Sequence, residues 1–443
     1  MRDTIDHLSA WFETHSDITQ ILVGLFDYNG VLRGKRVPAS KYKSLLTSGL
    51  KMPRSIQVLD ICGHDIEDSP LVFASGDADA TAHVTGRLPI RLPYLSEPTA
   101  LLLVAFDDEE ISPLPYVKAT DDEAIRLLCG VEMEFMLLHP DAAAPAPSLQ
   151  TGQSPQAGNI LSALHLDDYD GLLADIRSFC DGQNIAIDTI TSEAGMGQFE
   201  VTFQPKQDLA VLAEDILVFK SYVKGLAKSH GIKASFMAKP LEGQAGNGMH
   251  VHASIIDAQT GANLFDEETG GTAAEQRLFH SVGGLLAHMQ EASLIFAPLP
   301  NSYRRLVPSA HAPVQICWGY DNRTAAIRIP DSSPAARRLE VRSAGADANP
   351  YFLLALLRYA ILSGLAQEIT PPAAISGNAY EQSHPKLAQE MGQALALWDA
   401  SSALDALFGT ALKTMFADTK RQEFQIFTNH IPPMEFEILS EQL

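Results

Sequence analysis

GVEMEFMLL, residues 130–138, is an apolar, strand-like run that carries two acidic side chains, Glu132 and Glu134. Successive side chains on a strand point to opposite faces, so both carboxylates share one face while Met133 and Phe135 occupy the other. Taken alone, such alternation is more typical of a solvated sheet face than of a functional site. A functional interpretation therefore depends on whether other segments bring metal-binding or catalytic side chains to the same place.

Two further segments supply such side chains. In SEAGMGQFE, residues 192–200, Glu193 precedes a turn that contains glycines, and Glu200 lies on the predicted strand after it. Glycine adopts conformations that other residues avoid, so this turn can aim both carboxylates inward. In GNGMHVH, His250 and His252 are two residues apart on another predicted strand and share a face. A single histidine is more often structural, but this pair favours a ligand role about as strongly as a structural one.

Glu340, within RRLEVR, adds a further carboxylate to this set of candidate ligands. Oxygen ligands suit Mg²⁺ or Mn²⁺, whereas a zinc site would contain more histidine or cysteine. The number of carboxylates is sufficient for two ions. The candidate metal ligands are Glu132, Glu134, Glu193, Glu200, His250, His252 and Glu340.

Arginines are concentrated between residues 301 and 342 of a chain whose formal net charge is -22. They are Arg304, Arg305, Arg323, Arg328, Arg337, Arg338 and Arg342. Surface ion pairs explain Arg304 and Arg337 most simply. Arg328 and Arg342 lie within apolar strand sequence, where a guanidinium needs a partner such as phosphate or carboxylate. Carboxylate-bound metals together with converging arginines are typical of a phosphoryl-transfer site.

The composition is that of an ordinary globular protein: the 443 residues are 46% hydrophobic, which is enough for about two or three domains. The acidic balance argues against nucleic-acid binding. We find no membrane span, signal peptide or transit peptide, and therefore expect a soluble cytoplasmic enzyme. Cys62, Cys129, Cys180 and Cys317 lie far apart, so we interpret them as buried thiols rather than as a disulfide framework or a zinc site.

The pattern of predicted elements divides the chain into residues 1–106 and residues 107–443. The first part begins with a helix, and Asn29 and Gly30 form the tight turn of a predicted hairpin. A long loop follows at residues 54–81, and the apolar run TALLLVAFDD is a predicted strand that leads to the second part.

In the second part, helical and strand patterns alternate. A helix is predicted around residues 172–180, and strands are predicted at residues 185–190 and 198–203. Residues 142–158 are rich in proline, glycine and serine and form a predicted surface loop. Helical patterns dominate from residue 276 onward, apart from the arginine-rich stretch. No GxxxxGK[ST] loop and no kinase-type glycine loop is present, so ATP would bind through another architecture.

These segments, in this order, resemble the glutamine synthetase family, in particular its type I branch and the glutamylpolyamine synthetase-like relatives. The shared motifs are FDYNGVLRGKRVP, GDADATAHV, LPYLSEPTALLLVAFDD, GVEMEF, SEAGMGQFE, KPLEGQAGNGMHVH, NSYRRLVP, NRTAAIRIP, RRLEVR and ANPY. They cover nearly the whole chain, and their combination is highly specific. The resemblance implies an α+β protein, with an N-terminal β-grasp-like domain (residues 1–106) followed by a glutamine synthetase-type catalytic α/β domain (residues 107–443).

Position by position, the resemblance also implies roles for individual residues. One metal ion would be held by Glu134, Glu193 and Glu200, and a second by Glu132, His250 and Glu340. The nucleotide contacts would be His252, Ser254 and Arg338. Glutamate would be bound around Glu134, Gly246, His250, Arg305 and Arg342. The residues that act on its side-chain carboxylate and on the transferred phosphoryl group would be Arg323, Arg328 and Arg342.

The implied reaction uses ATP as a co-substrate and two or more Mg²⁺ or Mn²⁺ ions. Glutamate would be phosphorylated on its side chain, and an amine would then displace the phosphate to give a γ-glutamyl amide. Family members build each active site between neighbouring subunits of a six-membered ring. We therefore expect a homohexamer with shared sites.

Four positions depart from the family pattern. SAHAP places His311 where glutamine synthetases carry a flap glutamate, and MPRSI places Met52 where the family offers an aspartate to ammonium from the adjacent subunit. Both deprotonating acids are thereby replaced. Ala245 stands where an asparagine is usual beside the glutamate-binding glycine, and Ala335 stands where a nucleotide-contacting lysine is common.

The loss of both acids predicts that ammonia is a poor substrate, because capture and deprotonation of ammonium require carboxylates. Met52 and Ile56 suggest apolar walls, which favours a bulky, largely apolar primary amine, aromatic amines included, with His311 taking its proton. A polyamine ranks next, with Asp60 or Asp65 as acidic partners. Three further functions fit the sequence less well: an ordinary glutamine synthetase, a catalytically silent homologue that binds glutamate or nucleotide, and a nucleotide-independent metal hydrolase.

Overall fold

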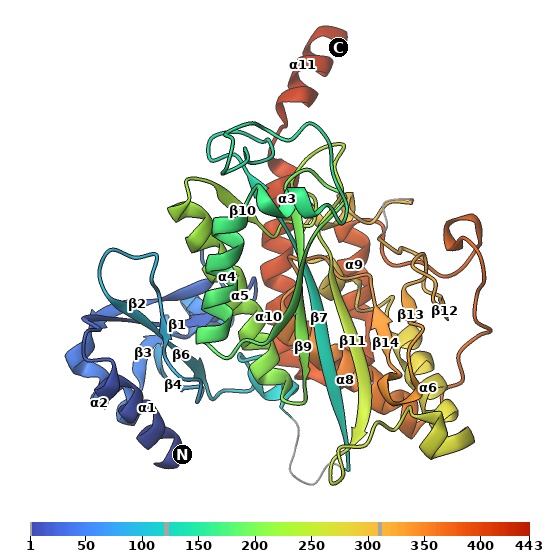
Figure 1. Ribbon diagram of the computed structural model, residues 1–443, viewed down its shortest axis with the longest axis horizontal. Helices are drawn as coiled ribbons and strands as arrows, with labels where there is room; N and C mark the ends of the chain where they lie inside the picture. The colour runs from blue at the N-terminus through green and yellow to red at the C-terminus, as the bar shows by residue number, and fades with distance from the viewer. Residues whose placement is uncertain (1, 119–123, 309–311) are drawn as a thin grey trace.

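The chain forms two β-sheets with helices packed around them (Figure 1). The structure is a computed structural model and describes residues 2–118, 124–308 and 312–443. One sheet is built from the N-terminal segment, drawn in blue, and the other from the segments that follow it. The mixture of helix and sheet agrees with the predicted fold class.

The N-terminal sheet has the strand order β2-β1-β6-β4-β3, with β5 paired to β6. Its elements are α1 (Arg2–Thr14), β1 (Gln20–Phe26), β2 (Leu32–Pro38), α2 (Tyr42–Ser48), β3 (Leu50–Pro53), β4 (Asp79–Val84), β5 (Ile90–Arg91) and β6 (Thr99–Phe106). β1 is parallel to β6 and antiparallel to β2, so the sheet is mixed. The predicted N-terminal helix and the strand in TALLLVAF are both confirmed.

The predicted hairpin at Asn29 and Gly30 joins β1 to β2 and also anchors the N-terminal sheet to the rest of the chain. Gly30 has a φ of +68°, which glycine adopts at little cost, and a Cβ there would lie 2.8 Å from Cδ2 of Leu217. The side-chain amide of Asn349 donates to the carbonyl oxygens of Asp27 and Tyr28, at 3.1 Å each. The hairpin turn is therefore fixed from both sides.

The second sheet has the strand order β12-β13-β14-β11-β7-β9-β8, with β10 paired to β7. Its strands are β7 (Ile125–Leu138), β8 (Ile187–Ser192), β9 (Gln198–Lys206), β10 (Lys233–Ser235), β11 (Met249–Asp257), β12 (Trp318–Tyr320), β13 (Ile327–Ile329) and β14 (Leu339–Val341). The strands predicted from GVEMEF, QFE and MHVH are thus β7, β9 and β11, which are direct neighbours.

The two faces of β7 differ as the alternation predicts. Met133 and Phe135 are fully buried, and the ring of Phe135 lies 6.0 Å from that of Phe199 and 6.3 Å from that of Phe219. Phe219 belongs to a helix, so this face carries the hydrophobic core. Glu132 therefore projects from the opposite face.

Helices make up most of the remainder. They are α3 (Ala163–Asp167), α4 (Asp170–Gly182), α5 (Leu209–Ser229), α6 (Glu267–His288), α7 (Ser293–Phe296), α8 (Pro350–Ala366), α9 (Met391–Ala400), α10 (Ser402–Asn429) and α11 (Pro433–Gln442). α8 is almost entirely buried and packs against α5 and α6. Residues 142–158 form no helix or strand, which confirms the predicted loop.

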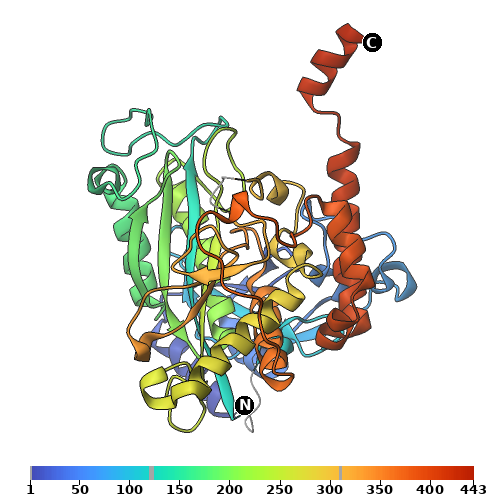
Figure 2. The same cartoon turned by 90° about the vertical axis from the view of Figure 1, so that its right-hand side faces the viewer.

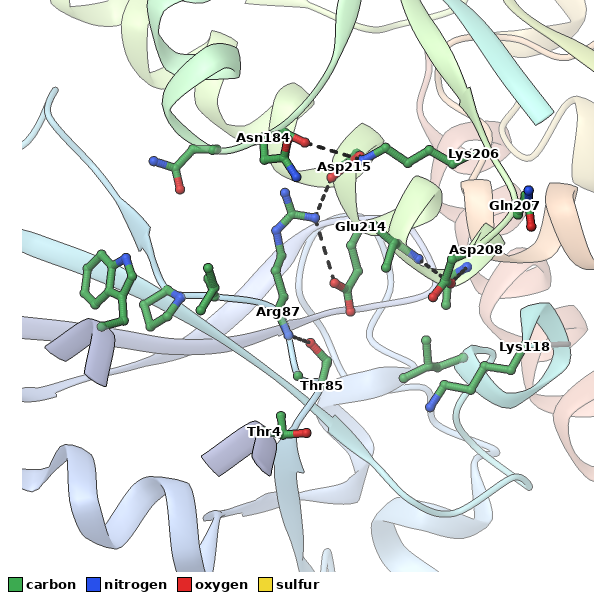
Figure 3. Close-up of a pocket in the computed structure, with 18 of the residues that line it drawn as sticks. Thr4, Thr85, Arg87, Lys118, Asn184, Lys206, Gln207, Asp208, Glu214 and Asp215 are labelled. Atoms are coloured by element: carbon green, nitrogen blue, oxygen red, sulfur yellow. Dashed lines mark hydrogen bonds and ion pairs between the residues drawn. The ribbon is translucent and has the colours of Figure 1, made fainter. Parts of the chain in front are cut away.

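A cavity of about 840 Å³ lies between the N-terminal sheet and the second sheet with its helices (Figure 3). On its wall, Nη1 of Arg87 lies 2.5 Å from Oδ1 of Asp215 and 3.9 Å from Oε2 of Glu214, and both acids belong to α5. Nζ of Lys206 pairs with the other oxygen of Asp215 at 2.5 Å. Burial raises the pKa of Glu214 to about 7. This ion network connects the two parts of the chain.

α10 is hydrogen-bonded to residues 54–81, the region that was predicted as a long loop. Thr419 donates to the carbonyl oxygen of Val58 at 3.0 Å, and the backbone N–H of Ile61 donates to Glu423 at 2.8 Å. This region includes short helical turns and the start of β4, so it is less irregular than predicted. Its Cys62 is exposed, which corrects the prediction that all four cysteines are buried; the other three are buried.

Beyond α10, α11 extends away from the body of the molecule in both views (Figures 1 and 2). Its apolar side chains are therefore exposed: Met434, Phe436, Ile438 and Leu439. Among the described residues, no helix combines the length and the apolar character needed to cross a membrane.

Candidate active site

Strand pairing brings the predicted ligands together on one face of the second sheet. Residues directly opposite one another on antiparallel strands have Cβ atoms about 5 Å apart, so their side chains meet. The opposed pairs are Glu132 with His250, Glu134 with Glu200, and Glu340 with His252. The sheet thus collects residues that are widely separated in the sequence.

Glu132 lies between the two histidines of β11. Its Oε2 is 3.2 Å from Nδ1 of His250, and its Oε1 is 2.9 Å from Nε2 of His252. Burial opposes ionisation of Glu132, but the hydrogen bonds to both histidines hold its pKa well below the usual range. Glu132 is therefore an anionic, oriented carboxylate, as a metal ligand must be.

Glu340 is fully buried and is bound by two arginines. Nη1 of Arg328 lies 2.9 Å from Oε2, and Nη1 of Arg342 donates to Oε1. Burial would raise the pKa of Glu340, but the charges of Arg342 and His250 lower it. The partner predicted for the two arginines in apolar strand sequence is thus a carboxylate of the protein, and Arg328 also pairs with Asp321.

Glu134 accepts hydrogen bonds from a neighbouring loop and from β9. The backbone N–H of Gly248 donates to its Oε2 at 2.6 Å, and Nε2 of Gln198 lies 3.4 Å from the same atom. Gln198 also donates to the carbonyl oxygen of Gly246 at 2.9 Å and to Oδ1 of Asn247 at 3.0 Å. Gln198 therefore fixes the glycine-rich segment relative to the carboxylates.

Glu193 and Glu200 are the two carboxyl groups of the cluster whose pKa values are raised. Burial and the neighbouring charge of Glu134 raise the pKa of Glu193 to about 7. Burial and the charges of Glu132 and Glu134 raise the pKa of Glu200 to about 9. Like charges at this density retain protons unless a cation compensates them, so these two carboxylates suit a divalent metal ion.

Two groups of side chains present their ligand atoms within 4.8 Å of one another: Glu132, Glu200 and His250 in one, and Glu132, His252 and Glu340 in the other. Both groups are rich in carboxylate oxygen, which fits Mg²⁺ or Mn²⁺. His252, predicted as a nucleotide contact, lies as close to the second group as a ligand would. The division of ligands between two ions stays a prediction.

Most of the predicted residues line one cavity of about 460 Å³. They are Glu132, Glu134, Glu193, Glu200, Gly246, His250, Arg305, Arg323 and Arg342. Ala245 lines it too, as do Ile160, Leu161 and Gln198, which were not among the predicted site residues. One wall of the cavity is therefore acidic and another cationic.

The cationic wall contains guanidinium groups that can still donate hydrogen bonds to a ligand. Arg342 is buried, and among the described residues its Nε has no hydrogen-bond partner. Arg305 is also buried, and its Nη1 donates to the carbonyl oxygen of Ser343 at 2.9 Å, so backbone contacts fix its orientation. Within the described part of the chain, Arg323 has no hydrogen-bond or ion-pair partner. A bound anion would satisfy these groups.

The remaining predicted residues border this cavity or lie apart from it. Arg328 and Arg323 line an adjacent hollow of about 810 Å³. Nε of Arg338 lies 3.2 Å from Nδ1 of His252, so the two predicted nucleotide contacts meet each other. Ser254 is buried two residues farther along the same face of β11. The nucleotide assignments remain predictions.

Met52 and His311 replace the family's deprotonating acids, and the structure describes only Met52. His311 lies outside the described residues. Met52, on β3 of the N-terminal sheet, is fully buried, with an exposed fraction of 0%. It packs in the core because inward and outward positions alternate along β3, and Met52 falls on the inward side. Met52 therefore cannot form an exposed wall of an amine site in this conformation, and that part of the interpretation was wrong.

Leu161 and Gln198 were missed for different reasons. Gln198 follows Gly197, which has a φ of +69°. The sequence predicts this turn between Glu193 and Glu200, so its position could have indicated Gln198. Leu161 follows the predicted loop at residues 142–158 and had no periodic signal, yet its backbone N–H donates to the carbonyl oxygen of Ser192 at 2.9 Å.

A family model described as "Glutamine synthetase, catalytic domain" matches residues 115–439. The chain belongs to the glutamine synthetase family. Gamma-glutamylputrescine synthetase PuuA from Escherichia coli (strain K12) is 30% identical, and the match covers 97% of this chain and 93% of that protein. A glutamate–isopropylamine ligase from Pseudomonas sp is 28% identical over 87% of this chain and 86% of its own. Glutamine synthetases from Pyrococcus and Thermococcus species match at 28% to 31% identity.

Solved structures also match the fold over nearly the whole chain. A GmaS/ADP complex superposes with a TM-score of 0.83 at 28% identity, covering 97% of this chain and 98% of the other. The similarity therefore extends over both sheets. Relatives that act on different amines match this chain at about the same sequence identity. Sequence identity alone therefore does not determine which amine this chain uses.

Proposed function

We propose that the protein is an ATP-dependent ligase that joins the side-chain carboxylate of glutamate to a substituted primary amine through γ-glutamyl phosphate. The observation that carries this proposal is the cavity of about 460 Å³ in which a carboxylate cluster faces three arginines. Such a cavity can bind metal ions on one side and anionic phosphate and carboxylate groups on the other. The similarity to a gamma-glutamylputrescine synthetase and to a glutamate–isopropylamine ligase supports ligation of glutamate to an amine.

We propose two or more Mg²⁺ or Mn²⁺ ions, one held by Glu134, Glu193 and Glu200 and another by Glu132, His250 and Glu340. The raised pKa values of Glu193 and Glu200 support a cation at this position, because only a compensating charge makes their joint ionisation favourable. When bound, the ions would cancel charge between the phosphates of ATP and the carboxylate of glutamate.

The arginines act on the substrates. Arg305, beside Gly246, would hold the backbone groups of glutamate, since a Cβ on Gly246 would lie only 2.8 Å from Cγ of Arg305 and would close that space. Arg342 and Arg323 would bind the side-chain carboxylate and the oxygens of the transferred phosphoryl group, with Arg328 contributing from the neighbouring hollow. His252, Ser254 and Arg338 would contact ATP, and the similarity to an ADP complex supports nucleotide binding by this chain.

An apolar side of the cavity supports an amine with an apolar substituent. Ile160 and Leu161 line the cavity and are 59% and 73% exposed, so they are available to a ligand. Leu161 has a φ of +57°, which is unusual for a branched side chain and indicates that its position is imposed by its surroundings. These residues replace Met52 as the apolar wall. We propose that the substituent is bulky, aromatic groups included, because Ile160 and Leu161 offer it a large, exposed apolar surface.

Polyamines are the second candidate, favoured by the 30% identity to gamma-glutamylputrescine synthetase. A second ammonium group would need an acidic partner. Asp60 is fully buried and already accepts hydrogen bonds, so only Asp65 of the two acids considered is exposed. Ammonia would be used least well, because Met52 and His311 stand where the family pattern has its two acids.

We propose the six-membered ring of the family for the assembly, with residues 1–106 as a separate N-terminal domain and residues 107–443 as the catalytic domain. The parallel pairing of β1 with β6 in the middle of a mixed sheet supports a β-grasp-like N-terminal domain. In such a ring, a neighbour's N-terminal domain would complete the open side of the cavity. A monomer that is fully active in solution, shown by light scattering during turnover, would contradict this arrangement.

The test is a comparison of kcat/KM for ammonia, putrescine, isopropylamine and an arylalkylamine, with glutamate and ATP saturating. Phosphate release that requires both glutamate and an amine would support the proposed ligase activity. If no amine gives such release, the protein is instead a catalytically silent homologue or a nucleotide-independent metal hydrolase. An apolar amine should give the highest value. If ammonia matches or exceeds every substituted amine, the protein is a glutamine synthetase; if putrescine is best, it is a polyamine ligase.

A further inference from the structure

Three potential metal ligands converge outside the active-site cavity, in the loop that follows β3. Asp60, Cys62 and His64 each present one ligand atom within 4.8 Å of the other two. They alternate along a short turn, as DICGH in the sequence. Cys62 and His64 are exposed, whereas Asp60 is buried at the base of the turn.

We propose that Asp60, Cys62 and His64 form a binding site for Zn²⁺ or a similar transition-metal ion. One thiolate, one imidazole and one carboxylate make a ligand set that Zn²⁺ prefers and that Mg²⁺ and Mn²⁺ do not. Three protein ligands leave the fourth tetrahedral position for water. The site is chemically distinct from the oxygen-rich cluster of the second sheet and is independent of the proposed ligase activity.

The spacing of the ligand atoms suits a tetrahedral ion. Oδ2 of Asp60 lies 3.4 Å from Nδ1 of His64. With bonds of about 2.0 Å to oxygen and nitrogen, two ligands of a tetrahedral zinc ion lie about 3.3 Å apart. These two atoms are therefore already close to the required separation.

The backbone of the turn holds its ends together before any ion binds. The backbone N–H of Asp60 donates to the carbonyl oxygen of His64 at 3.0 Å, and the N–H of His64 donates to Oδ1 of Asp60 at 2.9 Å. Gly63 has a φ of +87°, which allows the tight reversal between Cys62 and His64. A turn closed in this way loses little conformational entropy when an ion binds.

The rest of the molecule supports the turn. Nε2 of Gln422 on α10 donates to Oδ2 of Asp60 at 2.9 Å, so the carboxylate is oriented by a second element. Nη2 of Arg33 donates to the carbonyl oxygen of Asp60 at 3.2 Å, and the charge of this arginine is balanced by its ion pair with Asp27. A turn-capping role explains Asp60 alone; it does not explain a thiol and an imidazole on the same side of the turn.

The site can be tested with Co²⁺, which replaces Zn²⁺ and gives an absorption band when a thiolate binds it. The full-length protein would be freed of metal with a chelator, returned to excess Mg²⁺ to fill the oxygen-rich cluster, and titrated with Co²⁺. We expect a thiolate-to-cobalt band that saturates at one equivalent and disappears when Zn²⁺ is added. Only a thiol can produce this band, and Cys62 is the exposed one, with Cys129, Cys180 and Cys317 buried.

Two variants and one control complete the test. Cys62→Ser should abolish the band, and His64→Gln should weaken Co²⁺ binding about tenfold or more. Both side chains are exposed, so neither change should unfold the protein, which circular dichroism would verify. His83→Gln alters another exposed histidine of the same domain, beside Asp107, and should change nothing. The assignment is wrong if no band forms, if the band survives in Cys62→Ser, or if His64→Gln binds Co²⁺ as the unaltered protein does.

Discussion

His250 lies directly opposite Glu132 on the neighbouring strand, and its Nδ1 is 3.2 Å from Oε2 of that carboxylate. This contact links β7 and β11, two inner strands of the second sheet, and both side chains line the cavity. It also shows how the acidic part of the site is constructed: Glu132, His250 and Glu340 stand on three neighbouring strands and lie opposite groups on the adjacent strand. Changes at such positions should affect function through geometry as well as through charge.

Metal binding should release protons and should strengthen as the pH rises. Without metal, the pKa of Glu193 is about 7 and that of Glu200 is about 9, so below pH 7 both carboxyl groups are largely protonated and must lose their protons to bind an ion. We expect the affinity for Mn²⁺ to increase between about pH 6 and pH 9. Isothermal titration calorimetry in two buffers of different ionisation enthalpy would count the protons.

Glu193→Gln is the matched variant for this measurement. It should release fewer protons and should flatten the pH dependence near pH 7, because the remaining shift belongs to Glu200. An affinity that does not change with pH would show that the carboxylates are ionised before metal binds.

Replacing Glu340 should cost stability as well as activity. Glu340→Ala leaves the guanidinium groups of Arg328 and Arg342 without their shared carboxylate in a buried site, which costs about 3–5 kcal/mol. Glu340→Gln keeps the shape and an oxygen acceptor, so it should lose activity with a smaller loss of stability. Urea unfolding and phosphate release would be measured for both variants. Asp321→Asn, at the exposed partner of Arg328, is the control and should change stability far less, because solvent screens an exposed ion pair.

A methyl group at Gly248 should displace the side chains of Arg305 and His250 and reduce activity. A Cβ there would lie 2.7 Å from Nη2 of Arg305 and 2.8 Å from Nε2 of His250, so Gly248→Ala forces both side chains to move. Displacements of about 1 Å reduce rates about 100-fold, and we expect kcat/KM to fall by that order. Gly182→Ala, which meets no atom within 4 Å, is the control. Equal activity of the two variants would contradict the proposed positions of Arg305 and His250.

Leu161 should select the amine. Leu161→Ser removes apolar contact, and we expect kcat/KM for isopropylamine to fall about tenfold while the value for ammonia stays the same or rises. Leu164→Ser changes a side chain that is 77% exposed and does not line the cavity, so it should leave both values unchanged. A uniform loss for every amine in Leu161→Ser would indicate a structural role.

Arg87 should contribute to stability in a pH-dependent way. Arg87→Ala removes a cation from the buried acids Glu214 and Asp215 and should cost about 3 kcal/mol in urea unfolding at neutral pH. Arg91→Ala, from an exposed pair with Asp17, should cost under about 1 kcal/mol.

The sign of the pH effect follows from Glu214. Because burial raises its folded-state pKa to about 7, its favourable contribution to stability is complete below the ordinary pKa and is lost as the pH rises towards 7. Arg87 lowers that pKa, so its removal matters most when Glu214 is ionised. The difference between Arg87→Ala and the unaltered protein should widen from pH 5 to pH 8, and a constant difference would exclude this explanation.

The sequence by itself determined the local features of the site. A period of two placed Glu132 and Glu134 on one face, Asn29 and Gly30 formed the predicted hairpin, and the oxygen-rich ligand types indicated Mg²⁺ or Mn²⁺. The motif set indicated the family, which the family model confirms. These properties depend on residues close together in the chain, and local chemistry is sufficient to predict them.

Only the tertiary structure decided which distant residues meet. The strand order β14-β11-β7-β9 places Glu340, His252 and Glu132 in contact, and no local pattern encodes that order. The same applies to the burial of Met52 and to the exposure of Leu161, since burial depends on what packs against a segment from elsewhere in the chain. Long-range packing has no sequence period, which is why these features became visible only in the folded molecule.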